Sequence, residues 1–131
     1  MTTPTVARLT VPARVFTTPE NKTLYQYDPA AAPVDFKQGK PIGNRCVRLA
    51  DFEKPAGEWN TIELVCTGGD SIHVVNGHVV MRLKDARRKG DYGDWLPLSE
   101  GRICLQTEGA EIYYREVEIR PITAVPAEYK E

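Results

Sequence analysis

Short runs of alternating apolar and polar residues, separated by turn residues, extend along most of the chain, and helical periodicity is almost absent. Alternation with a period of two predicts strands, and many short strands joined by turns are typical of an antiparallel all-β protein. The predicted strands span residues 6–11, 23–27, 45–49, 60–67, 71–75, 78–83, 102–107 and 111–120. Residues 28–44, with several Pro and Gly, predict a long irregular loop, and residues 122–131 predict a flexible tail. The length of 131 residues fits a single β-sandwich domain.

The strongest local prediction is a β-hairpin centred on Asn76-Gly77, which lies between two runs of β-branched residues. Both central positions of a type I′ turn need positive φ, which Asn and Gly adopt readily. The expected pairs are Val75 with His78, Val74 with Val79, His73 with Val80 and Ile72 with Met81. Since opposed residues share a face, the residues expected to face the core are Ile72, Val74, Val79 and Met81. His73 and His78 would lie on the outer face.

The other predicted strands divide in the same way. At 60–67, the alternation places Ile62, Leu64 and Cys66 toward the core and points Glu63 away from it. In 102–107, Ile103 and Leu105 are expected to face inward. In 111–120, Arg115 falls on the apolar face, so either a bulge directs it to a site or it pairs with a carboxylate at the rim.

Charge and composition argue against several classes of function and of stabilising site. The chain carries 17 Lys+Arg and 18 Asp+Glu, and this near-neutral balance argues against nucleic acid as a partner. No apolar run approaches the roughly 20 residues that span a bilayer, so we expect no membrane insertion. The first residues lack the features of a signal peptide, and the sequence assigns no compartment. The 3 widely spaced cysteines predict buried free thiols rather than a disulfide or zinc framework.

Three segments in the second half carry longer motifs. The run DFEKPAGEWNTIE spans 51–63, the Asn-Gly hairpin follows, and LSEGRICLQTEGAEIYYREVEIRPI spans 98–122. In this order they resemble the 3-keto-disaccharide hydrolase domain family, whose corresponding elements read DFEKPxGEWNxIEL, VxxxNG and LxxGxIxLQxEGxE. The resemblance covers residues 51–122.

The resemblance implies a concanavalin-like jelly-roll sandwich of two curved antiparallel sheets. Domains of this family are longer, so it also implies that the chain holds mainly their C-terminal portion. A half sandwich would leave an apolar face and open edges, and we therefore expect a homo-oligomer in which a second copy completes the layers. Alternatively, the strands within residues 6–27 supply the missing edges.

A sugar site needs an aromatic platform, polar groups for hydroxyls and titratable groups near the anomeric carbon. The candidate substrate-binding residues are Trp95, Gln106, Tyr114 and Arg115. The candidate catalytic acids or bases are Glu63, His73 and Glu108. A simpler interpretation is that the carboxylates are merely solvated and that the histidine has no catalytic role.

The resemblance also implies a reaction on a small-molecule carbohydrate. A 3-keto group acidifies the proton on C2, so a base can remove it, the glycosidic oxygen can leave C1, and water addition completes net hydrolysis. His73 and His78 lie diagonally on the predicted hairpin, but no third ligand follows at metal-ligand spacing, so the sequence indicates no metal and no cofactor. The alternatives to a hydrolase are a non-catalytic carbohydrate-binding module and a fragment whose role is assembly.

Overall fold

The computed structural model describes residues 7–37 and 45–131, which form an open, mixed β-sheet. Its strands are β1 (Ala7–Thr17), β2 (Thr23–Tyr27), β3 (Pro33–Lys37), β4 (Cys46–Val47), β5 (Ile62–Thr67), β6 (Asp70–Val75), β7 (His78–Lys89) and β8 (Trp95–Pro97), followed by the short 3-10 helix η1 (Ala127–Tyr129). The strand order is β4-β2-β1-β7-β6-β5, with β3 also paired to β1 and β8 to β7. The predicted all-β class is confirmed, and the architecture is consistent with a jelly-roll-like β-sandwich. No helix among the described residues is both long and apolar enough to cross a membrane.

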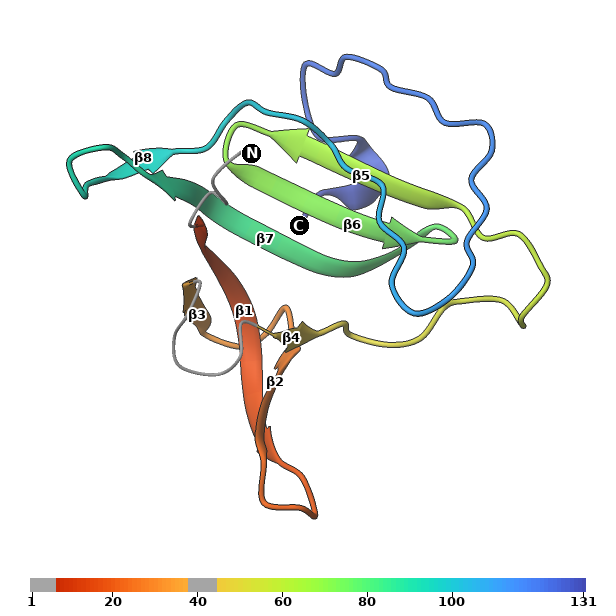
Figure 1. Ribbon diagram of the computed structural model, residues 1–131, viewed down its shortest axis with the longest axis horizontal. Coiled ribbons are helices and arrows are strands. Elements are labelled where there is room, and N and C mark those ends of the chain that lie inside the picture. Colours follow the sequence, from red (N-terminus) through yellow and green to blue (C-terminus); the bar gives the residue numbers. More distant parts are fainter. Residues whose placement is uncertain (1–6, 38–44) are drawn as a thin grey trace.

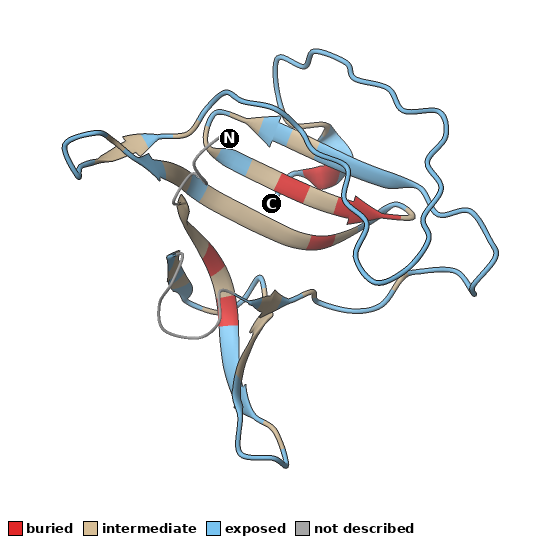
Figure 2. Ribbon diagram, viewed as in Figure 1, coloured by how far each residue is buried: buried red, intermediate tan, exposed pale blue. Residues whose placement is uncertain are grey.

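The sheet has two parts, and each has its own small core (Figures 1 and 2). One part is formed by β5, β6 and β7, and its buried residues include Ile72, Val74 and Val80. The other part is formed by β1 with β2, β3 and β4, and it buries Val11 and Tyr27. The β1–β7 pairing joins the two parts, so residues at this junction belong to strands that are distant in sequence.

The Asn-Gly turn forms as predicted, with φ of 48° at Asn76 and 81° at Gly77. The pairs Val75–His78 and Val74–Val79 are confirmed. Beyond them the register shifts, so that His73 pairs with Met81 and Ile72 with Arg82, and the predicted pairs farther from the turn are wrong. Val80 is the extra residue of this bulge and is buried. The bulge moves Met81 to the face of His73 and brings Arg82 to the face of Ile72.

The predicted orientation of β5 is also wrong. A tight turn at Gly68-Gly69 pairs Thr67 with Asp70, and this register places Glu63 opposite Val74. Because opposed residues share a face, Glu63 and Val65 lie on the core side, and Ile62, Leu64 and Cys66 lie on the other. Ile62, Leu64 and Cys66 are accordingly exposed.

The remaining strand predictions differ from the structure in several places: β1 runs on to Thr17, beyond the predicted end at residue 11, and β4 covers only Cys46–Val47 of the predicted 45–49. The predicted irregular loop contains β3, which pairs with β1, while residues 38–44 lie outside the described residues. β7 extends to Lys89 and pairs with β8, which the alternation did not predict. Residues 102–107 and 111–120 form no strand, because the backbone there has no strand partner in the described sheet; they run outside it as the blue segment of Figure 1.

The predicted flexible tail is instead packed against the sheet. Tyr129 is 9% exposed and forms a cluster with Ile72 and Val74. Its carbonyl oxygen accepts a hydrogen bond from Arg82 Nη2 at 2.6 Å, and Glu131 forms an ion pair with Lys84 at 2.8 Å. The last residues of the chain therefore cover the face of β6 that the sequence predicted as core.

Candidate functional site

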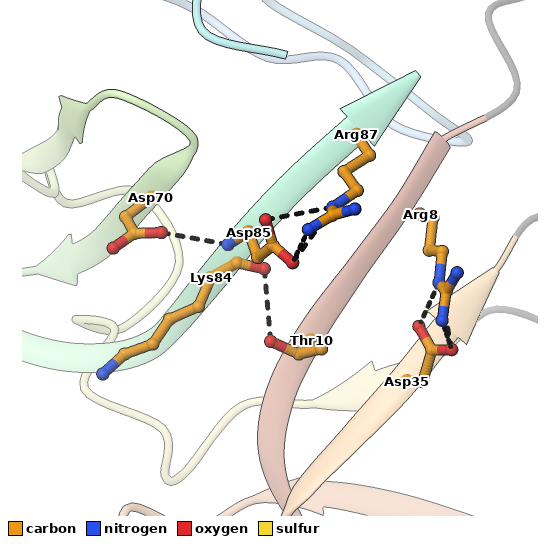
Figure 3. A network of polar contacts seen from close by, with 7 residues as sticks. All are labelled: Arg8, Thr10, Asp35, Asp70, Lys84, Asp85 and Arg87. Atoms are coloured by element: carbon orange, nitrogen blue, oxygen red, sulfur yellow. Dashed lines mark hydrogen bonds and ion pairs between the residues drawn. The ribbon is translucent and has the colours of Figure 1, made fainter. Parts of the chain in front are cut away.

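A small polar pocket lies where β1, β3 and β7 meet (Figure 3). Its volume is about 140 Å³, and its lining residues are Arg8, Leu9, Thr10, Asp35, Asp85 and Arg87. Arg8 pairs with Lys37 of β3 and with Arg87 of β7, so side chains of three strands share one face. We call this the polar face, and its members are Arg8, Thr10, Asp35, Arg87 and Trp95.

A second β-bulge shapes the pocket. Thr10 pairs with Lys84 while Arg8 pairs with Arg87, so β7 carries an extra residue here, and Asp85 has a φ of 54°. The amide of Asp85 donates to Asp70 Oδ1 at 2.9 Å, and the hydroxyl of Thr10 donates to the carbonyl of Lys84 at 3.3 Å. Bulges redirect side chains, and this one places the Asp85 carboxylate in the pocket wall.

Two ion pairs line the pocket. Arg8 donates from Nε to Asp35 Oδ1 at 2.9 Å and from Nη2 to Asp35 Oδ2 at 2.6 Å. Arg87 Nη2 lies 2.9 Å from Asp85 Oδ2. The hydrogen bonds from Arg8 lower the pKa of Asp35, so this carboxylate stays ionised at neutral pH. All four side chains are solvent-accessible, so the pairs contribute little stability, and their donors and acceptors are available to a ligand.

Trp95 lies beside this pocket on the same face. It pairs with Lys89 at the start of β8, and its ring centroid is 5.9 Å from Arg8 Cζ and 5.5 Å from Lys37 Nζ. An aromatic surface next to convergent polar groups is the arrangement that a sugar site requires. Guanidinium donors and carboxylate acceptors of balanced charge suit a neutral ligand rich in hydroxyl groups.

The predicted catalytic residues do not come together. Glu63 accepts a hydrogen bond from the hydroxyl of Tyr129, on the core side of β5. His73 is opposite Leu64 and therefore lies on the other side, where burial lowers its pKa. Glu108 is exposed in the segment after β8, where Gln106 Nε2 donates to it at 3.5 Å.

The other predicted binding residues contact one another or the loop before β5. The hydroxyl of Tyr114 donates to the carbonyl of Gln106 at 2.6 Å. The guanidinium of Arg115 lies 4.1 Å from the ring centroid of Trp59. Trp95 is therefore the predicted binding residue that adjoins the polar pocket.

An apolar groove of about 320 Å³ lies on the opposite face of β1. Its lining residues are Ala7, Leu9, Val11, Phe36, Lys37, Cys46, Met81 and Leu83. The Cys46 thiol is half-buried, and burial raises its pKa. The cysteines are free, but Cys66 and Cys104 are exposed, so their predicted burial is wrong. The described residues contain no group of three His, Cys, Asp or Glu that could hold a metal ion.

None of the lining residues of the polar pocket was predicted from the sequence, including its four charged residues Arg8, Asp35, Asp85 and Arg87. They belong to no motif. The signal that points to them is local, because Arg8 and Thr10 alternate with apolar residues on β1, as Asp35 does on β3. That alternation identifies a polar face but not which strands meet there.

Comparison with protein families supports a carbohydrate-related role. The family model described as 3-keto-alpha-glucoside-1,2-lyase-like domain matches residues 16–120. The match contains Asp35, Asp85 and Trp95, whereas Arg8 precedes it. It begins well before the motifs at 51–122, and the prediction that the chain holds mainly a C-terminal portion of the domain is not confirmed. Comparisons with curated proteins and with solved structures gave no match.

Proposed function

Because the chain belongs to the 3-keto-alpha-glucoside-1,2-lyase-like domain family, we propose that it binds a 3-keto-glycoside on the polar face and cleaves its glycosidic bond. The observation that carries the proposal is the pocket beside Trp95. Two carboxylates and two guanidiniums line it, and the aromatic ring adjoins it on the same face. The apolar groove on the opposite face of β1 has no carboxylate among its lining residues.

The dimensions of the site suit partial enclosure of the substrate. Ligand sites that enclose a whole small molecule usually measure about 300–1,000 Å³. At about 140 Å³, this pocket has room for one edge of a sugar ring. The ring would stack on Trp95, its hydroxyls would bind the Arg8–Asp35 and Arg87–Asp85 pairs, and the rest of the glycoside would extend into solvent.

The family description names a 1,2-lyase, which implies elimination across C1 and C2. The C2–H bond breaks and its proton passes to a base. The C1–C2 double bond then forms as the bond from C1 to the glycosidic oxygen breaks, and the leaving oxygen takes a proton from the protonated base or from water. A cation near the C3 oxygen stabilises the enolate that forms. Asp85 lines the pocket beside Arg87 and joins the predicted candidates for the base, which are Glu63, His73 and Glu108.

The test is to incubate the purified chain with an aryl 3-keto-α-glucoside and to measure both binding and release of the phenol. Trp95→Ala is expected to weaken binding about fivefold, because loss of an aromatic contact costs about 1 kcal/mol. Tyr92→Ala is the matched control, since Tyr92 lies in the adjacent turn and is 98% exposed. It should leave binding unchanged.

Variants of the candidate bases separate recognition from cleavage. Asp85→Asn should abolish release of the phenol and leave binding within a few-fold, whereas Glu108→Gln should change neither if Asp85 is the base. Binding without turnover would favour the alternative of a non-catalytic carbohydrate-binding module. A chain that neither binds nor cleaves the glycoside would contradict the proposed function.

A further inference from the structure

β5 is an open edge of the sheet. It ends the strand order and pairs with β6 on one side, while its other side has no strand partner among the described residues. Ile62 and Leu64 are 67% and 43% exposed there. Natural edge strands are usually protected by Lys, Pro or a bulge, but β5 contains neither Lys nor Pro. Its one charged residue, Glu63, is hydrogen-bonded to Tyr129.

The same chain carries an extended segment that lacks a strand partner. Residues 102–107 alternate as a strand does, and Ile103 and Leu105 are exposed. The exposed large apolar residues between 103 and 122 are Ile103, Leu105, Ile112, Tyr113, Tyr114, Val117, Ile119 and Ile122. Clusters of exposed apolar side chains on this scale mark interaction surfaces.

We propose that residues 102–107 of a second copy of this chain add to β5 as an antiparallel strand, in a reciprocal two-fold dimer. Each copy contains both the open edge and the strand-like segment, so one symmetric exchange satisfies both. The register that joins the apolar residues places Leu105 opposite Ile62 and Ile103 opposite Leu64. Arg102 of the second copy then lies diagonal to Glu63, close enough for the two opposite charges to attract each other.

The exposed apolar surface reaches the lower end of the range for a stable dimer. Stable interfaces bury about 1,200–2,000 Å² in total. Each copy offers four exposed large apolar side chains in the paired segments and six more between residues 112 and 122, ten in all. If each lost about 60 Å², two copies would together bury about 1,200 Å². The net charge of −1 adds little repulsion between copies.

Light scattering on the purified chain at micromolar concentrations tests the oligomeric state. We expect a dimer that becomes a monomer in Leu64→Lys, because a lysine opposite Ile103 would be buried without a partner. Tyr92→Lys adds the same charge at a fully exposed turn and should remain dimeric. Circular dichroism checks that both variants stay folded. A monomeric unmodified chain would overturn the proposal.

A cross-link tests the register and does not depend on a destabilising variant. In the proposed pairing Glu63 lies opposite Cys104, so Glu63→Cys in a background of Cys46→Ser and Cys66→Ser should form an intermolecular disulfide under mild oxidation. A band at twice the chain mass on a non-reducing gel is expected, and it should disappear when Cys104→Ser is added. A disulfide within a single chain would show that the segment pairs with its own β5, and it would refute the exchange.

Discussion

Replacing Tyr129 measures how much the C-terminal residues contribute to stability. The ring is 9% exposed and packs in the cluster with Ile72 and Val74, and its hydroxyl donates to the Glu63 carboxylate. A hydrogen bond to a charged group contributes about 1.5–3 kcal/mol when it is buried. Glu63 is exposed and is resolvated when the donor is removed, so Tyr129→Phe should lower the free energy of unfolding by about 1 kcal/mol. Tyr129→Ala also removes the ring from the cluster and should cost about 3 kcal/mol.

The pH dependence of stability supplies a second measurement on the same residue. The hydrogen bond to Glu63, and then burial, raise the pKa of Tyr129 from 10.0 to about 12. A folded-state pKa above the unfolded value stabilises the fold below the unfolded pKa, and this contribution is lost as the pH rises through the folded value. The contribution from Tyr129 should therefore disappear between pH 10 and 12, and Tyr129→Phe should lack this part of the pH dependence.

Urea unfolding followed by fluorescence measures these differences, with Tyr113→Phe as a matched control. The hydroxyl of Tyr113 also donates to a glutamate, Glu111, but both residues are exposed. This control should change the free energy of unfolding by less than about 0.5 kcal/mol. Equal effects of the two Tyr→Phe substitutions would refute the assignment of a packed, hydrogen-bonded role to Tyr129. A loss below about 1 kcal/mol in Tyr129→Ala would refute the packing of the tail itself.

Two further predictions concern the hairpin. Asn76 Nδ2 donates to the Phe52 carbonyl at 2.7 Å and to Asn60 Oδ1 at 2.8 Å. Asn76→Gly keeps the positive φ but loses these hydrogen bonds, so it should lower the free energy of unfolding in urea by about 2 kcal/mol. Asn76→Ala should lower it by about 1 kcal/mol more, because an alanine is strained at positive φ. A smaller loss in Asn76→Ala would contradict the role of the backbone conformation. Burial lowers the pKa of His73, so its contribution to stability is present above the unfolded pKa of about 6.5 and is lost as the pH falls through the folded pKa. His73→Gln should therefore show a smaller fall in Tm than the unmodified chain between about pH 7 and pH 5, and equal falls would contradict the buried, neutral state.

Local chemistry was sufficient for the predictions that succeeded. The Asn-Gly turn formed because two residues alone determine its geometry, and the first pairs beside it followed. The register failed beyond Val74, because a bulge depends on what packs against the strand. The side of the sheet that each residue of β5 faces could have been predicted from the sequence, since the Gly68-Gly69 turn determines the register of β5 against β6. The family was also predicted from motifs, and the family match at 16–120 confirms it.

Predictions that required knowledge of a partner failed. The alternation at 102–107 and 111–120 describes which side chains share a face, but a strand forms only where another backbone pairs with it. The tail was expected to be flexible, yet Tyr129 packs on Ile72 because the register of β5 and β6 leaves an apolar face to cover.

By itself, the sequence determined the all-β class, the hairpin at Asn76 and the family, because each depends on neighbouring residues or on motifs in order. Trp95 was also named from the sequence as a candidate binding residue. Only the tertiary structure decided that Arg8, Asp35 and Asp85 meet beside it, since they come from three strands brought together by pairing and by a bulge. The physical reason is that strand alternation assigns a side chain to a face, whereas long-range hydrogen bonding between strands decides which faces adjoin.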